Sequence, residues 1–121
     1  MTLTALSSQR KSTRYAVDLD VEVVHEGQSF MGKAENMSIG GMFMYTHTSL
    51  PFGARLALKF AIPTLKEPIQ VNGQIRWIDN ISSPSNEEGE KSTGVGIQFD
   101  GLRAKHVWAL NKFFETTEKA D

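Results

Sequence analysis

Apolar and polar residues alternate along most of the chain, a pattern typical of strands with one buried face. The first alternation covers residues 17–24, and a turn at 25–28 leads into a second strand over 29–35. Similar alternation predicts three further strands, at 55–62, 69–77 and 94–99, and the short apolar run at 42–46 predicts one more. The polar, glycine-rich segment 36–41 is predicted to be a turn or a strand junction.

Beyond residue 101 the apolar period changes from two to that of an α-helix. Val107, Leu110 and Phe114 recur at i, i+3 and i+7, which predicts an amphipathic helix over about 102–118. Packed on the sheet, this helix is expected to bury three large aromatic side chains, Trp108, Phe113 and Phe114.

Six short, evenly spaced strands and one helix predict an all-β fold with a terminal helix, built as an antiparallel barrel or sandwich. The length of 121 residues, 40% of them hydrophobic, fits one globular domain. No stretch approaches the roughly 18 apolar residues of a membrane span. Residues 1–9 lack a signal-peptide pattern, so we expect a cytoplasmic protein without membrane insertion.

Charge is distributed unevenly along the chain. There are 13 basic and 14 acidic residues in total, and residues 1–16 hold three basic ones and no acid, so residues 17–121 carry 10 and 14. A flexible basic arm, residues 1–14, thus precedes an acidic body, 15–118, and either captures an anion or is a solvated tail. A barrel that binds single-stranded nucleic acid needs a basic groove, so we expect no nucleic-acid polymer as partner.

The residues needed for catalysis are missing from the sequence. There is no cysteine, no nucleophile elbow and no P-loop, and no histidine stands at metal-ligand spacing. The first strand carries its carboxylates on one wet face, at Asp18, Asp20 and Glu22. We therefore predict no enzyme, no metal site and no catalytic cofactor. Each of the three histidines is expected to be a surface or interface residue and not a metal ligand, at His25, His47 and His106.

Two short clusters have more specific chemistry. Arg10 and Arg14 form an R-x-x-x-R, and two guanidinium groups in an arm can close on a compact anion or on the edge of guanine. Asn36, Ser38 and Gly41 form an N-x-S-x-x-G, which combines an amide, a hydroxyl and a residue that permits close approach. Taken singly, either cluster is equally typical of an ordinary tail or turn.

In this order and at this separation, the two clusters resemble the motifs of the PilZ domain family. Further similar segments are the turn 51–56, the strand 73–77 with its G-x-I-x-W, and the strand 94–99 with its G-V-G-I-x-F. The resemblance covers roughly residues 8–116.

The resemblance implies a six-stranded antiparallel β-barrel with a C-terminal helix that binds cyclic di-GMP. Carried over to this sequence, Arg10 and Arg14 would grip the phosphates and the guanine edges. Asn36 and Ser38 would hydrogen-bond a guanine, and Gly41 would leave space for the ligand or shape the wall of the site.

Three further residues are weaker candidates for ligand binding. Gln9 directly precedes the first arginine. In the family that Arg10 and Arg14 resemble, an additional arginine at this place implies an intercalated ligand dimer, so Gln9 favours one ligand per chain. Lys11 could still support a second ligand. Trp77 either stacks on a guanine or is a tryptophan of the core or of the barrel face.

The expected mechanism is ordering of the arm: ligand phosphates neutralise its cations, and the arm folds onto the barrel. A domain of this size would then signal through an effector protein, in motility, biofilm or polysaccharide control. The alternative is a degenerate PilZ protein that binds no nucleotide and acts only by protein contact. The sequence leaves the effector and the oligomeric state open.

Overall fold

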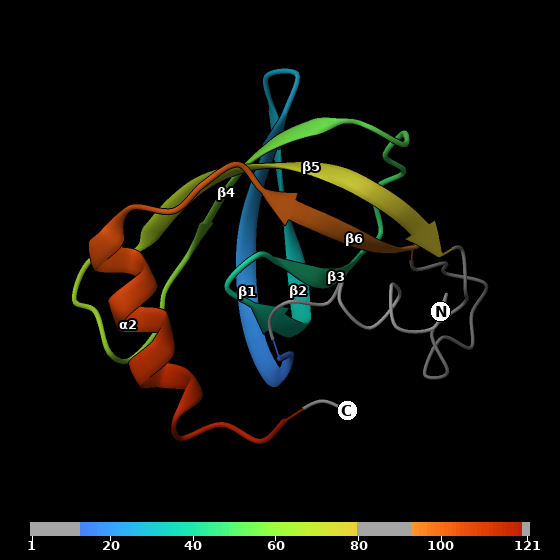
Figure 1. Ribbon diagram of the computed structural model, residues 1–121. Coiled ribbons are helices and arrows are strands. Elements are labelled where there is room, and N and C mark those ends of the chain that lie inside the picture. The colour runs from blue at the N-terminus through green and yellow to red at the C-terminus, as the bar shows by residue number, and fades with distance from the viewer. Residues whose placement is uncertain (1–12, 80–92, 120–121) are drawn as a thin grey trace, which may run out of the picture.

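The computed structural model describes residues 13–79 and 93–119. Within these residues, six strands and one helix follow one another (Figure 1). They are β1 (Tyr15–His25), β2 (Gln28–Ser38), β3 (Gly41–Thr46), β4 (Arg55–Phe60), β5 (Ile69–Asp79), β6 (Thr93–Phe99) and α2 (Ala104–Phe114).

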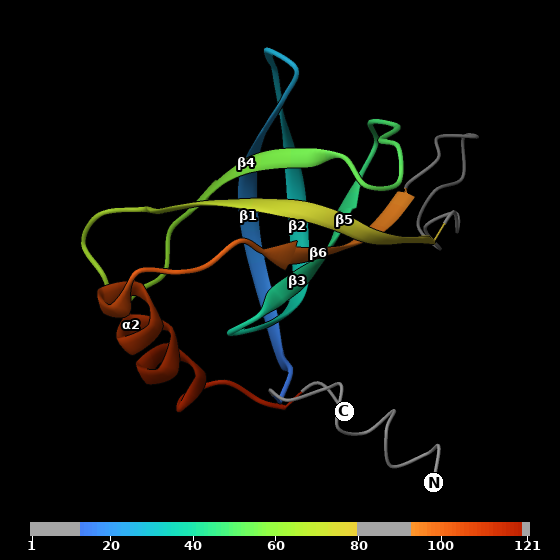
Figure 2. The ribbon, with the colours of Figure 1, turned by 45° about the horizontal axis from the view of Figure 1, so that its top comes forward.

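The strands form a closed antiparallel barrel in the order β1-β2-β3-β6-β5-β4 (Figure 2). This confirms the predicted six-stranded barrel with a C-terminal helix. The closure between β1 and β4 is short, because only residues 22–24 of β1 pair with 57–59 of β4. The first half of β1 therefore runs beyond β4 and pairs with β2 alone in the barrel.

The period-two pattern of the sequence corresponds to the two faces of the barrel wall. In β4, for example, Leu56, Leu58 and Phe60 are buried while the residues between them are exposed. The wet face of β1 is also as predicted, and Lys33 on β2 reaches both Asp18 and Asp20, with Nζ–Oδ1 distances of 3.1 and 2.9 Å. The hydrogen bonds to Asp20 and Asp18 raise the pKa of Lys33, which stays charged.

The core fills the barrel and continues under α2. Methionine contributes strongly, with Met37, Met42 and Met44 completely buried. Methionine side chains are flexible and fill irregular gaps in a core. Leu110 and Phe114 of α2 extend the same core, and the ring of Phe114 stacks on Tyr15 with centroids 4.5 Å apart.

The helix lies beside the barrel, next to the β4–β5 connection (Figure 1). Two contacts hold it there: Thr64 donates its hydroxyl to the carbonyl oxygen of Ala109 at 2.7 Å, and Lys105 Nζ lies 2.8 Å from a Glu67 carboxylate oxygen. The helix ends at Phe114 rather than near residue 118. Just after this end, the hydroxyls of Thr116 and Thr117 both donate to the carbonyl oxygen of Phe113.

Two predictions about the helix were wrong. Trp108 is 61% exposed instead of buried, while His106 is buried instead of lying at the surface. Helical geometry explains both. Trp108 and Leu110 are two residues apart, about 200° around the helix, so they cannot both face the barrel, whereas His106 lies one turn from Leu110 on the same side.

The segment after the helix returns to the start of β1. The amide of Ala16 donates to the carbonyl oxygen of Glu118 at 2.8 Å, and Tyr15 forms an isolated bridge with Lys119. This segment takes up part of the β1 edge that β4 leaves unpaired. Nowhere in the described ranges is there a helix long and apolar enough to span a membrane.

Candidate functional site

The start of β1 brings Arg14 to the end of β2. Tyr15 pairs with Met37 and Ala16 with Asn36 in the antiparallel ladder, so the residue just before β1 lies beside the polar end of β2. Arg14 Nη1 donates to Asn36 Oδ1 at 2.8 Å in a partly buried setting. One residue from each predicted motif is thereby joined. Arg10, Gln9 and Lys11, like most of the predicted arm, lie outside the described residues.

A β-bulge determines where Asn36 points. The register between β2 and β3 shifts between Ala34 and Asn36, so Glu35 is an extra residue on β2. Ala34 and Met37 both face the core, and the two residues between them, Glu35 and Asn36, are not buried. Bulges of this kind re-aim side chains next to binding sites. Here the bulge keeps Asn36 on the outer wall of the barrel.

Ser38 shapes the turn that links β2 to β3. The predicted turn over 36–41 is shorter in the structure, because β2 continues through Ser38 and only residues 39 and 40 form the turn. Ser38 is 7% exposed, and its Oγ accepts a hydrogen bond from the amide of Gly40 at 3.1 Å. A hydroxyl has one donor hydrogen besides its acceptor lone pairs, so Ser38 can hold the turn and still donate to a ligand.

Gly41 allows β3 to approach β6 closely. It is buried and pairs with Gln98, and a Cβ added there would collide with the carbonyl oxygen of Ile97. The adjoining turn is tied to the same strand, because the amide of Phe99 donates to the carbonyl oxygen of Gly40 at 2.8 Å. Of the two roles considered for Gly41, the geometry favours shaping the wall over leaving ligand space.

A row of aromatic and small residues continues across the outer wall from Asn36. The ladders pair Asn36 with Phe43, Phe43 with Gly96, and Gly96 with Trp77. The rings of Phe43 and Trp77 are stacked with centroids 6.0 Å apart, and Tyr45 meets Phe43 edge-on at 5.2 Å. Trp77 is 47% exposed and therefore lies on the barrel face and not in the core.

A second bulge, on β5, turns Trp77 outward. The register shifts between Ile75 and Trp77, which leaves Arg76 as the extra residue, and both Arg76 and Trp77 are exposed. The ring of Trp77 covers Gly96, where an added Cβ would lie 2.7 Å from the indole. Glycine opposite tryptophan thus makes a flat aromatic surface that is open to solvent.

The sequence reasoning missed Phe43 and Tyr45. A signal was present, because aromatics at 43 and 45 alternate on one strand and glycines at 94 and 96 alternate on another. Aromatic rings commonly cover glycines on a neighbouring strand. Burial, Glu35 and Asp79 raise the pKa of Tyr45, in that order of effect, so its hydroxyl stays neutral.

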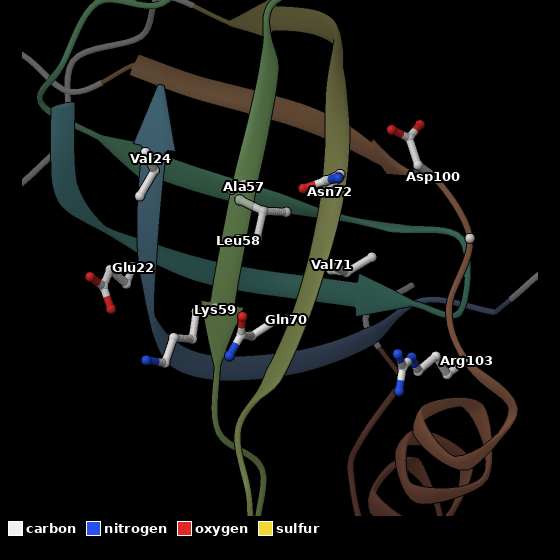
Figure 3. Close-up of a pocket in the computed structure, with 11 residues that line it drawn as sticks. Glu22, Val24, Ala57, Leu58, Lys59, Gln70, Val71, Asn72, Asp100 and Arg103 are labelled. Carbon is white, nitrogen blue, oxygen red and sulfur yellow. The ribbon is translucent and has the colours of Figure 1, made fainter. Parts of the chain in front are cut away.

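An open hollow of about 400 Å³ lies over another part of the wall, on β1, β4 and β5 (Figure 3). None of the predicted site residues lines it. Glu22 and Lys59 lie at one end and Asp100 and Arg103 at the other, so each end carries both signs of charge (Figure 3). This distribution does not favour an anion.

The histidines are scattered over the fold. His25 ends β1, His47 follows β3 and His106 lies in α2. Within residues 13–79 and 93–119, no three His, Asp or Glu side chains are grouped so that they could hold a metal ion.

These observations describe a small β-barrel domain whose outer wall carries an arginine, polar side chains and aromatic rings. The PilZ domain family model matches residues 8–115. The chain therefore belongs to the PilZ domain family, as its motifs indicated. No curated protein sequence matches it.

Solved structures share this fold at low sequence identity. Bacillus subtilis MotI, an inhibitor of motility, has a TM-score of 0.71 at 22% identity, covering 88% of this chain and 50% of its own. The complex of K. pneumonia MrkH with c-di-GMP scores 0.66 at 17%, covering 85% and 49%. The PilZ domain of Escherichia coli YcgR with c-di-GMP scores 0.69 at 12%, covering 89% and 90%. This chain thus spans about half the length of MotI and MrkH.

Proposed function

We propose that this protein is a receptor for cyclic di-GMP and has no catalytic activity. The observation that carries the proposal is the hydrogen bond between Arg14 and Asn36, which joins the two motifs on the outer wall next to Ser38. Two structural neighbours, MrkH and the PilZ domain of YcgR, are described with c-di-GMP. Their fold, together with the arginine and N-x-S-x-x-G motifs of this chain, supports the same ligand here.

The proposed contacts follow from the chemistry of each side chain. Arg14 and Arg10 provide planar forks that bind phosphate oxygens or the O6 and N7 edge of guanine. Asn36 and Ser38 offer hydrogen bonds to a guanine from the barrel side. Trp77 provides a face on which a base can stack, and such stacking contributes about 1–3 kcal/mol per base.

Arg14 is partly positioned before any ligand arrives. Asn36 Oδ1 accepts a hydrogen bond from Nη1 of its guanidinium, a group that carries five N–H donors in all. Holding the side chain in advance reduces the entropy that binding must remove. Asn36 would thus act on the ligand directly and also through Arg14.

Ligand binding would order the arm and present a new surface to an effector. Ordering each backbone residue costs about 1–2 kcal/mol, which charge-assisted bonds and stacking must offset. A micromolar dissociation constant corresponds to about −8 kcal/mol, a surplus that several such contacts can supply. We place this signalling in the cytoplasm, in motility, biofilm or polysaccharide control, in line with the inhibitor of motility among its neighbours.

Isothermal titration of the full chain with cyclic di-GMP, with GTP as the control ligand, tests the proposal. We expect one ligand per chain and no binding of GTP. Arg14→Ala should weaken binding at least about tenfold, since a bidentate contact of this kind is worth about 1–3 kcal/mol. Arg103→Ala is the matched control, because Arg103 is an exposed arginine at the start of α2 and borders the other hollow.

Asn36→Ala should weaken binding with the barrel intact, and Asn72→Ala on β5 is its control. Unchanged affinity in the Arg14 variant would refute the assignment of the arm. Complete absence of binding by the wild-type chain would favour the alternative, a degenerate PilZ protein that acts only by protein contact.

A further inference from the structure

The outward face of α2 carries a tryptophan, Trp108, that is not part of the hydrophobic core. Trp108 is 61% exposed and lies on the side of the helix opposite Leu110, which faces the barrel core. Exposed tryptophan is a frequent anchor of protein interfaces. Lys112, one turn further along the helix, has its Nζ 5.7 Å from the centroid of the Trp108 ring.

Trp108 belongs to a narrow stripe of four exposed residues. Lys105, Trp108, Lys112 and Glu115 follow at i, i+3, i+7 and i+10, which places them within about 80° of one another around the helix. Their side chains form a row along the helix in the order cation, indole, cation, anion. We call this row the α2 stripe.

The α2 stripe is complementary to itself in one orientation. When two copies of α2 lie antiparallel and cross at the level of residue 110, each Trp108 faces Lys112 of the second copy. In the same register each Lys105 faces Glu115 of the second copy. Both pairs are attractive, one by cation–π interaction and the other by charge. Two-fold symmetric interfaces require this kind of self-complementarity.

The charges also continue an existing ion-pair network. Lys105 already binds Glu67 at 2.8 Å, and Glu115 lies 3.8 Å from Lys112 within its own chain. In the antiparallel pair the charges form a row of alternating sign. The row begins with Glu67 and Lys105 of one copy and continues with Glu115 and Lys112 of the second copy. Networks of alternating charge are stronger than isolated surface pairs.

Within a single copy, both ends of α2 carry charges that oppose the helix dipole. The first turn has no acid and contains Lys105, and Glu115 stands at the C-cap, whereas Lys112 in the last turn has the sign that the dipole favours. A helix favours acids at its N-terminus and bases at its C-terminus. In the antiparallel pair Lys105 and Glu115 each lie next to an opposite charge. The two helix dipoles then run in opposite directions side by side, which is the favourable arrangement.

From these observations, we propose that the α2 stripe is a self-association surface, with a second copy of this chain as its partner. An 11-residue helix is about 16 Å long, so its face buries less than the roughly 800 Å² per partner of a standard stable interface. The dimer is therefore weak, and it forms only as the protein concentration rises. This inference is independent of the ligand assignment, because α2 contains none of the proposed ligand contacts.

Sedimentation velocity of the full chain, from low micromolar to millimolar concentration, measures the association. The wild type should shift from monomer to dimer across this range. Trp108→Ala should weaken the dimer by about tenfold or more, as expected for an interface anchor. Phe52→Ala is the matched control, because Phe52 is 68% exposed in the turn before β4 and should leave the dimer unchanged.

Charge reversal tests the antiparallel register. Lys105→Glu places Glu against Glu in both pairs, and Glu115→Lys places Lys against Lys, so each variant alone should remain monomeric. An equal mixture of the two should associate again, because each pair then joins opposite charges. The double variant Lys105→Glu/Glu115→Lys should also dimerise, since the swap keeps opposite charges facing each other.

Circular dichroism confirms in parallel that each variant is folded. A wild type that stays monomeric at every concentration would overturn the proposal. So would a dimer that is indifferent to Trp108→Ala, or single variants whose mixture fails to associate. Loss of cyclic di-GMP binding alone would not affect it, so the two proposals fail separately.

Discussion

Replacing Gly41 by alanine tests whether this motif glycine serves the fold or the ligand. A Cβ at position 41 would collide with the backbone carbonyl oxygen of Ile97 and lie 3.2 Å from the Cα of Gln98. Backbone atoms cannot rotate away as a side chain can, so β3 and β6 must separate. We therefore expect Gly41→Ala to destabilise the barrel whether or not ligand is present.

The magnitude follows from three contributions. Overpacking of this kind costs about 1–3 kcal/mol. Separation of the strands also stretches the hydrogen bond from Phe99 to the Gly40 carbonyl, now 2.8 Å, which is worth about 0.5–1.5 kcal/mol. Alanine restricts the unfolded chain and returns about 0.4–1 kcal/mol. The net loss is about 0.5–4 kcal/mol.

Gly40→Ala is the matched control, since it changes the neighbouring glycine in the same turn. Its Cβ would meet only Ser38 Oγ at 3.8 Å, an ordinary contact, and its backbone does not require a positive φ. Both variants restrict the unfolded chain equally, so their difference isolates the clash. We expect the free energies of unfolding to differ by about 1.5–4.5 kcal/mol.

Urea denaturation followed by circular dichroism gives both free energies. With a slope of about 1–3 kcal/mol per molar urea, the Gly41 variant should unfold at a midpoint lower by roughly 1 M or more than the Gly40 variant. Equal midpoints for the two variants would refute the close approach of β3 and β6. A stable Gly41→Ala protein that had lost only ligand binding would return Gly41 to the ligand site.

Two further predictions concern α2. Burial, followed by the nearby Lys105 and Arg103, lowers the pKa of His106 in the folded state. The folded protein therefore has its full stability above the pKa of unfolded histidine, and the free energy of unfolding should fall as the pH drops from about 7 toward 5. Thermal melts should show this loss, and a His106→Gln variant with the same pH slope would contradict it. Leu110→Ala should cost about 2–5 kcal/mol in urea unfolding because Leu110 is fully buried, and a loss below 1 kcal/mol would mean that α2 is not firmly docked.

Alternation was sufficient to predict most of the strands, because each strand of a filled barrel has one buried and one wet face. The short apolar run at 42–46 predicted β3. β4 shows this most clearly, with every second residue buried. The bulges were not predictable, because an extra residue at Glu35 or Arg76 leaves the composition of the strand unchanged. Their effect is local, yet they put Asn36 and Trp77 on the outer wall.

The helix shows a different limit of sequence reasoning. The repeat of Val107, Leu110 and Phe114 predicted the element, but hydrophobicity then assigned Trp108 to the core as well. The angular position on the helix was the better guide, and it buries His106 with Leu110 instead. The candidate site itself depended on motif order, and the structure adds the hydrogen bond that connects the motifs.

The pairing of Ala16 with Glu118 has a consequence for protein architecture. It brings the first strand and the segment after α2 to the same place, one residue from Tyr15 and two from Arg14. Residues 13 and 119, the two outer limits of the described barrel domain, therefore lie beside the arginine. The barrel is thus connected to the rest of its polypeptide, on both sides, next to the proposed ligand site.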